Sequence, residues 1–142
     1  MEISKKGFYY NDLTSLSLPN SVMLIDEYAY EGNSLSALTI PKNLIIIGNE
    51  SFCDNQLTSI TIPNNVIRID MWGAFADNRL NNVVFEENSR LRSIGDRAFR
   101  GAYITEVNIP DTVNYLSCVA FNDNVIINKR ENLKKFFKNF FS

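Results

Sequence analysis

The most regular feature of the chain is an aromatic side chain that recurs every 22 to 24 residues. The aromatic column consists of Phe8, Tyr30, Phe52, Phe75, Phe99 and Phe121. An aliphatic column lies five residues further on and consists of Leu13, Leu35, Leu57, Leu80, Ile104 and Ile126. A repeat of this length is typical of solenoids, in which similar units stack on one another. The pattern therefore predicts a repeat solenoid with a partial first repeat and five further repeats.

Each repeat contains a short alternation of apolar and polar residues that predicts a β-strand. In the clearest copy, Ile60 and Ile62 alternate with Ser59 and Thr61, and Pro63 follows directly. Period-two alternation indicates a strand, and proline ends it because proline has no N–H for the ladder. Equivalent apolar pairs are Leu16 and Leu18, Leu38 and Ile40, Val83 and Phe85, and Val107 and Ile109. We expect one short parallel strand per repeat, all on one face.

The second half of each repeat predicts a short helical or 3-10 turn on the opposite face. Apolar residues three positions apart, such as Val66 and Ile69, are followed at once by a residue that favours a helix N-cap. The residues at this position are Ser4, Asp26, Gly48, Asp70, Gly95 and Ser117. A short turn that begins here would carry the chain to the next aromatic residue.

An asparagine stands three residues after most of the aromatic residues. The set is Asn11, Asn33, Asn55, Asn78 and Asn124, with Ala102 in the remaining place. A side-chain amide can satisfy buried backbone groups of its own turn and of a neighbouring one. We interpret the column as a structural ladder; a row of amides that binds a ligand is the alternative.

The tail has a different pattern from the repeats. Leu133, Phe136, Phe137, Phe140 and Phe141 follow the spacing of an amphipathic helix, with lysines between them. The pattern predicts a solenoid over residues 1–128 and a C-terminal amphipathic helix over residues 129–142 that caps the last turn. The alternative is a basic amphipathic helix that lies on a membrane or on a partner.

The repeat pattern L-x-x-I-x-I-P-x-x-V-x-x-I-G-x-x-A-F-x-x-N resembles the BspA-like, or treponemal-type, leucine-rich repeats over about residues 3–127. The segments 57–75 and 107–121 match it best. The resemblance implies a right-handed coil of the β/α type and a role in protein recognition or adhesion. Members of the family are typically bacterial or protist surface proteins, so a cell-surface or secreted location is also implied. The family supplies no catalytic motif to transfer.

Composition narrows the classes of function. The net charge of −2 argues against nucleic-acid binding, and no apolar run reaches the roughly 18 to 20 residues of a transmembrane helix. No signal peptide is visible at the start, so the location stays open. Cys53 and Cys118 lie three repeats apart, roughly 14 Å in a stack with a spacing of about 4.8 Å. Such a distance is too long for a disulfide, and free cysteines are compatible with the cytoplasm.

Enzymatic activity is not expected from this chain. It contains no histidine, the commonest general base and a frequent metal ligand. Gly48 and Gly95 are isolated repeat glycines rather than parts of a phosphate-binding loop. The sequence therefore predicts no catalytic residues, no metal and no cofactor.

We predict instead a surface that binds a protein partner. The outward positions of the strands form the first candidate set: Ser15, Ser17, Thr39, Ser59, Thr61, Asn82, Val84, Glu106 and Asn108. Trp and Arg are favoured at interface hot spots, and the second set, expected on the rim of the strand face, consists of Trp72, Arg79, Arg90 and Arg92. The alternatives are a solvated strand face, a Trp72 that covers an inserted residue, and arginines neutralised by their acidic neighbours.

A structural role is the second hypothesis. The partial first repeat would leave the edge of its strand open, and an open edge invites pairing with another molecule. The chain would then form a homo-oligomer through its first turn or its Phe-rich tail. A native chain that continues upstream would cover the same edge.

Overall fold

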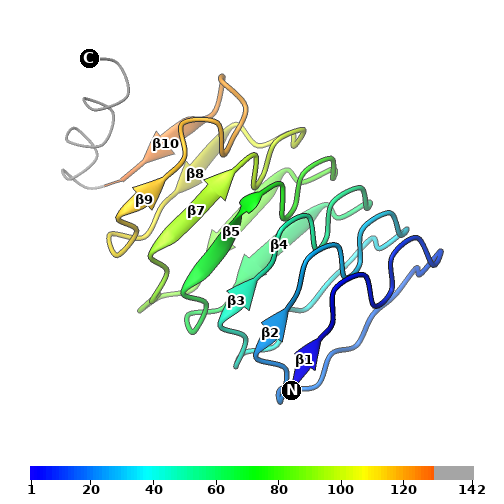
Figure 1. The fold of residues 1–142 in the computed structure, drawn as a ribbon. Helices are drawn as coiled ribbons and strands as arrows, with labels where there is room; N and C mark the ends of the chain where they lie inside the picture. The colour runs from blue at the N-terminus through cyan, green and yellow to red at the C-terminus, as the bar shows by residue number, and fades with distance from the viewer. Residues whose placement is uncertain (130–142) are drawn as a thin grey trace.

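The computed structural model describes residues 1–129, and within this range the chain winds into a parallel β-solenoid. Successive turns stack along one axis, with the N-terminus at one end of the stack (Figure 1). The predicted repeat solenoid is thereby confirmed. The predicted helix over residues 129–142 lies, apart from Lys129, outside the described residues.

A six-stranded parallel sheet, which we call sheet A, runs along one face of the solenoid (Figure 1). Each turn contributes one strand, and neighbours in the sheet come from neighbouring repeats. Its strands, in sheet order, are β1 (Glu2–Ile3), β2 (Leu24–Ile25), β3 (Ile46–Ile47), β5 (Arg68–Trp72), β7 (Ser93–Asp96) and β9 (Tyr115–Leu116). These segments were expected to wall the core and lead into a helical turn, not to form a sheet.

The predicted strands lie on a second face, behind sheet A in Figure 1. Strand β4 (Ser59–Ile62) pairs with β6 (Asn82–Phe85), and β8 (Glu106–Asn108) pairs with β10 (Ile126–Asn128). The earlier copies at residues 16–18 and 38–40 form no strand. The prediction of one strand per repeat on a single face is therefore wrong, because most turns pair on both faces and the first turns pair only in sheet A.

No helix occurs among residues 1–129, so the predicted helical or 3-10 turns are also wrong. The third side of each turn is an arc whose backbone alternates between local and inter-turn hydrogen bonds. Glu50, Phe52 and Asp54 donate their N–H groups to carbonyl oxygens of the next turn at 2.7, 2.9 and 3.0 Å. Ser51 and Cys53 donate to carbonyls three residues back at 3.3 and 3.2 Å. A helix cannot form when every second N–H is bonded to another turn.

The arc also needs left-handed backbone at fixed positions. Glu50 and Asp54 have φ of 50° and 54°, and the equivalent residues Tyr28 and Gly32 have φ of 57° and 69°. Glycine occupies such a conformation without steric cost, whereas other residues are strained there. The ladder between turns holds this backbone in place in each repeat.

The interior is a continuous apolar column with the aromatic residues stacked along it. Rings of consecutive turns are 5.1 to 5.5 Å apart between centroids and within 11° of parallel. Tyr30, Phe52, Phe75 and Phe99 are fully buried, and aliphatic residues of both sheets surround them. Phe8, at the open end of the stack, is 41% exposed. The aromatic column of the sequence therefore corresponds to a stack of rings in the core, as expected.

The asparagine ladder is confirmed in the middle of the chain. Buried Asn55 donates from Nδ2 to the carbonyls of Tyr30 in the preceding turn (2.9 Å) and of Phe52 in its own turn (3.2 Å). Its Oδ1 accepts the Leu35 N–H at 3.0 Å. Asn33 and Asn78 make equivalent bonds. In the last repeat Asn122, rather than the exposed Asn124, bonds across to the preceding turn.

Candidate interaction surfaces

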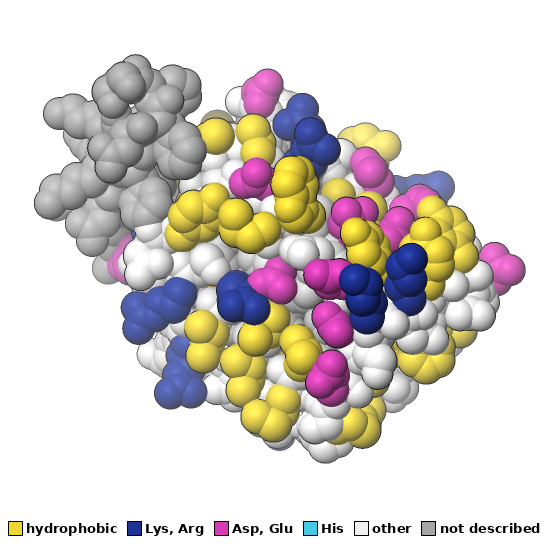
Figure 2. All heavy atoms as spheres, in the orientation of Figure 1, with side chains coloured by type: hydrophobic (Ala, Val, Ile, Leu, Met, Phe, Trp, Pro, Cys, Tyr) yellow, Lys and Arg dark blue, Asp and Glu magenta, His cyan; other side chains and the backbone are white. Residues whose placement is uncertain are grey.

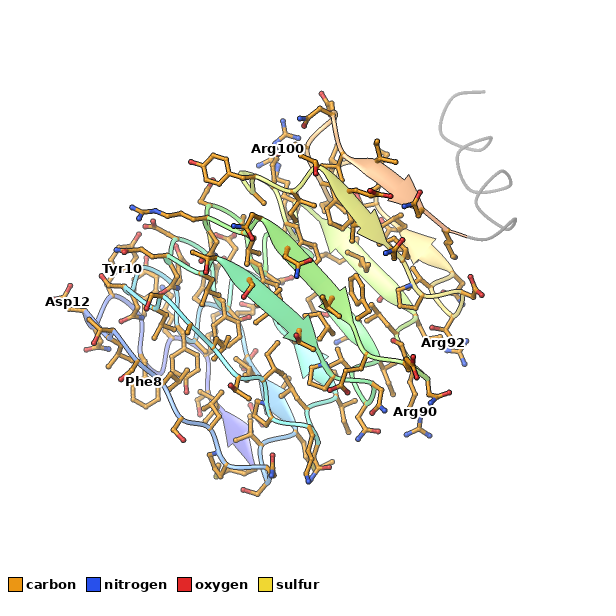
Figure 3. All side chains as sticks on the ribbon, turned by 180° about the vertical axis from the view of Figure 1, so that it is seen from behind. Phe8, Tyr10, Asp12, Arg90, Arg92 and Arg100 are labelled. Atoms are coloured by element: carbon orange, nitrogen blue, oxygen red, sulfur yellow. The ribbon has the colours of Figure 1, made fainter. Side chains whose placement is uncertain are left out.

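The predicted strand face is exposed along its whole length, and Figure 3 is seen from this side of the molecule. In β4, Ser59 and Thr61 point outward while Ile60 and Ile62 are buried. They lie opposite Asn82 and Val84 of β6. The remaining predicted residues, Ser15, Ser17, Thr39, Glu106 and Asn108, are likewise exposed. We call these nine residues the strand face.

A hollow of about 240 Å³ lies in the middle of the strand face, lined by Thr39, Ser59, Thr61 and Glu86 among others. Glu86 is fixed there because its Oε2 accepts the Asn64 N–H at 2.9 Å. Hydroxyl groups beside a carboxylate can exchange hydrogen bonds with a partner's backbone or side chains.

Strand β10 extends the strand face by residues that sequence reasoning missed. Ile126, expected in the buried aliphatic column, is 61% exposed and lies opposite Glu106. Asn128 donates from Nδ2 to Glu106 and, at 3.2 Å, to Asn108 Oδ1. Ile126 leaves the core because the last repeat reaches its strand sooner: Glu106 stands seven residues after Phe99, whereas its partner Ile126 stands five residues after Phe121. Because Val125, Ile126 and Ile127 are all apolar, no alternation in the sequence identifies the exposed position.

The four predicted rim residues lie at three different places around a turn. Trp72 ends β5 and is 50% exposed, with the Arg97 guanidinium 5.9 Å from its ring centroid. Arg79 lies between the arc and β6, beside the strand face. Arg90 and Arg92 lie together on the edge between the two sheets, well apart from Arg100 (Figure 3). The structure therefore brings Arg90 and Arg92 together but separates Trp72 from them.

Sheet A presents a second surface that sequence reasoning did not single out. Met23 and Ile67 are each exposed over somewhat less than half of their surface beside the sheet, and Leu24, Ile45 and Ile46 are more buried. Figure 2 shows hydrophobic side chains on this side of the molecule, interspersed with acidic and basic ones. The residues come from uninterrupted apolar runs such as Val22–Ile25, in which periodicity cannot distinguish inward from outward positions. Apolar side chains on an open face favour contact with another surface.

An aromatic and cationic cluster covers the arcs of the first two turns. Lys6 Nζ is 5.1 Å from the Tyr9 ring centroid and 5.6 Å from that of Tyr28. Tyr10 lies flat against Gly32, where a Cβ would come within 2.5 Å of the ring, and its hydroxyl donates to Asp54 at 3.5 Å. The cluster joins the exposed rings of Tyr9 and Tyr10 to the half-buried ring of Tyr28.

Carboxylates gather on the neighbouring arcs around the thiol of Cys53. Burial raises the pKa of Cys53 to about 12, and the charges of Asp77, Glu31, Glu50 and Asp54 add to the effect. Burial, followed by the charges of Glu50 and Asp54, also raises the pKa of Glu31 above its ordinary value. A thiol in such surroundings stays protonated and unreactive at neutral pH.

Two further properties of the described residues bear on function. Among residues 1–129, no three Cys, Asp or Glu side chains are grouped so that they could hold a metal ion. Over the same residues no helix is long and apolar enough to cross a membrane. Cys53 and Cys118 are both free, the first buried and the second exposed.

In the described part of the chain no turn packs on the outer side of the first turn, which leaves core residues there incompletely covered. Ile3, Leu13, Leu16 and Leu18 pack against the core but are only partly buried. Self-association of this chain through its first turn stays a prediction, and the Phe-rich tail that was its other candidate lies outside the described residues.

Comparison with protein families decides the class of this solenoid. The BspA type leucine rich repeat region matches residues 1–142 with six copies. The chain belongs to the BspA-type leucine-rich repeat family. The resemblance seen in the repeat pattern is therefore confirmed over the whole chain. No curated protein and no solved structure gave a significant match.

Proposed function

We propose that this BspA-type repeat protein is a non-catalytic recognition module that binds a protein partner through its strand face. The observation that supports the proposal most is the exposure of all nine strand-face residues over a rigid apolar core. Strand pairing holds the backbone of six of them, Ser59, Thr61, Asn82, Val84, Glu106 and Asn108, so little backbone entropy is lost when a partner binds. Arg79 on one flank and Arg90 on the other could add charge-assisted hydrogen bonds. An adhesive role at a cell surface is the finer form of the same proposal.

The test uses affinity capture from the cells that produce the protein. The double variant Thr61→Arg with Val84→Arg places two bulky charges at the centre of the strand face without touching the core. We expect the wild-type chain to retain a discrete partner and the variant to lose at least nine-tenths of it. Ile46→Arg on the opposite sheet is the matched control and should capture normally. Equal capture by the wild-type chain and the strand-face variant would contradict the proposal.

A further inference from the structure

A column of apolar side chains runs along the edge of sheet A and ends in an arginine. The column consists of Met23, Ile45, Ile67 and Arg92, one residue from each of four successive turns. The N–H of each later residue donates to the carbonyl oxygen of the one before it, at 2.8 to 2.9 Å. Met23 is 49% and Ile67 41% exposed. Three apolar side chains therefore lie in a row at about the 4.8 Å spacing of neighbouring strands.

A second column runs beside the first and also ends in an arginine. It consists of Asn20, Asn43, Asn65 and Arg90. Asn43 Nδ2 donates to Asn20 O at 2.9 Å, and Arg90 Nη1 donates to Asn65 Oδ1 at 3.5 Å. Between the columns lies a groove of about 320 Å³ that is lined by Met23, Ile45 and Ile67 on one side and by the amides and Arg90 on the other.

The groove has a positive end. Arg90 and Arg92 border the lengthened turn after β6, and both side chains are exposed. Within residues 1–129 the ion pairs are Lys5 with Glu27 and Arg68 with Asp70, so neither Arg90 nor Arg92 is paired with a carboxylate there. Glu86, in the same turn, points to the strand face and accepts the Asn64 N–H. Arg90, which lines the groove, and Arg92, which lies near it (Figure 3), are thus available at one end of an apolar groove.

We propose that this groove binds an extended segment of a partner protein, with alternate apolar side chains followed by an Asp or Glu. Three inter-turn spacings from Met23 to Arg92 amount to about 14 Å, which equals the span of residues one to five of a strand at about 3.4 Å per residue. Residues one and three would cover Met23, Ile45 and Ile67, and the carboxylate of residue five would reach the arginines. Carboxylates bind guanidinium groups in bidentate geometry.

The site lies across the edge of the solenoid from the strand face, so it goes beyond the proposed function and can fail separately. The apolar floor favours a peptide over a nucleic acid, whose backbone would place phosphates along the whole groove. A protein segment also supplies main-chain N–H groups, which can donate hydrogen bonds to Asn43 Oδ1.

The probe is a fluorescein-labelled peptide, Leu-Thr-Leu-Thr-Glu-Thr, with an amidated C-terminus so that the glutamate supplies the only carboxylate of the peptide itself, the anionic label being common to the probe and its control. The matched control peptide has lysine in place of glutamate. Titration is followed by fluorescence anisotropy and by NMR shifts of the backbone amides of Ile45, Ile67 and Arg92. We expect saturable binding of the glutamate peptide at least tenfold tighter than that of the lysine peptide, with shifts confined to the groove.

The double variant Arg90→Glu with Arg92→Glu should reverse this preference without disturbing the core, because both side chains are exposed and, within residues 1–129, their guanidinium groups make one long hydrogen bond, from Arg90 to Asn65. Arg79→Glu with Arg100→Glu changes the net charge equally and should leave the preference intact. Ile67→Asp should weaken binding of both peptides at least tenfold. The strand-face variant Thr61→Arg with Val84→Arg should bind normally.

Circular dichroism of each variant shows whether the fold is retained. Three results would overturn the proposal: no saturable binding, no reversal by the folded charge-reversed variant, or loss of binding in the strand-face variant. Displacement of the peptide by a single-stranded oligonucleotide at equal concentration would also overturn it and assign the arginines to phosphate.

Discussion

At the residue scale, side-chain amides supply hydrogen-bond partners for backbone groups that are buried between the stacked turns. The arc and the strand that follows it are joined by a bend in which backbone groups would be buried without partners. Asn33, Asn55 and Asn78 each supply donors and an acceptor there and reach into the preceding turn. Ala102 lacks these groups, so one junction in the stack has no such side-chain bridge. A buried backbone group without a partner costs free energy comparable to a lost hydrogen bond.

Replacing Asn55 by Ala should lower the free energy of unfolding by about 3 kcal/mol, since each buried polar group left unpaired costs roughly 1–3 kcal/mol. The Leu35 N–H and the Tyr30 carbonyl would lose their amide partners. Asn11→Ala is the control, because Asn11 is exposed and its side chain makes a single long bond to Tyr9 O. That variant should stay within about 0.5 kcal/mol of wild type. Urea denaturation measures both, and equal losses would refute the ladder's structural role.

At the scale of elements, the one-residue insertion in the fourth turn is absorbed by a β-bulge rather than by a loop. The pairing of β5 with β7 shifts between Ile69 and Trp72, so that Asp70 and Met71 both lie opposite Gly95. A Cβ on Gly95 would lie 2.2 Å from Asp70 O and 2.5 Å from Met71 Cα. The glycine predicted as a helix cap is therefore needed because another backbone approaches closely. The bulge also leaves Met71 and Trp72 exposed at the edge of the sheet.

The variant Gly95→Ala should be destabilised by at least about 2 kcal/mol, because overpacking against backbone costs typically 1–3 kcal/mol and neither strand can move away alone. Gly7→Ala provides the comparison. Its column contains Ala29, Ala74 and Ala98 in other turns, so alanine fits there and should change stability by less than about 1 kcal/mol. Thermal unfolding of the two variants side by side measures the difference. A Gly95→Ala protein as stable as Gly7→Ala would show that the bulge does not need glycine.

The strands of the second face could be predicted from the sequence, and those of sheet A could not. Ile60 and Ile62 alternate with small polar residues, and this alternation identifies the strand. In Ile45-Ile46-Ile47 every position is apolar, so a strand and a buried helical segment look alike. The arcs were misread because Tyr28, Glu50 and Arg97 adopt left-handed backbone without the glycine or asparagine that normally marks it. Hydrogen bonds between turns determine these backbone conformations, and the local sequence contains no pattern from which such bonds could be predicted.

The candidate surfaces show the same limit. Exposure of the strand face followed directly from period two, and all nine residues are exposed as expected. To predict which rim residues lie together, one must know which residues of a long turn meet in space. Trp72 and Arg92 are only 20 positions apart, less than one repeat, yet they lie at opposite ends of the sheet A strands because each turn passes through three sides. Spacing along the chain cannot supply that placement without the path of a single turn.

At the scale of the whole molecule, stability is a sum over neighbouring turns, and the aromatic stack joins them. Phe75 is fully buried, with rings of adjacent turns at 5.5 and 5.4 Å. Phe8 has one such neighbour, Tyr30 at 5.1 Å, and is partly open to solvent. A gap in the middle of the stack therefore weakens two interfaces, whereas a gap at the end weakens one.

Phe75→Ala should lower the free energy of unfolding by about 3–5 kcal/mol, the usual cost of a large cavity in a packed core. Phe8→Ala should cost less than about half as much. Because the central cavity weakens the coupling between the two halves, its urea transition should also broaden, and Trp72 fluorescence and circular dichroism should no longer coincide. Equal destabilisation by both variants would mean that the turns do not contribute through their neighbours.

The buried, protonated thiol of Cys53 makes the opening of the stack measurable through its rate of alkylation. At pH 8 a cysteine with a pKa of about 12 holds only about one thiolate in ten thousand molecules, and its side chain is enclosed by the third turn. An alkylating reagent can therefore reach it at an appreciable rate only when that turn separates from its neighbours. Cys118, which is exposed, reacts without any such opening. The ratio of the two labelling rates therefore reports how often the centre of the stack opens in the native protein, with no engineered cysteine.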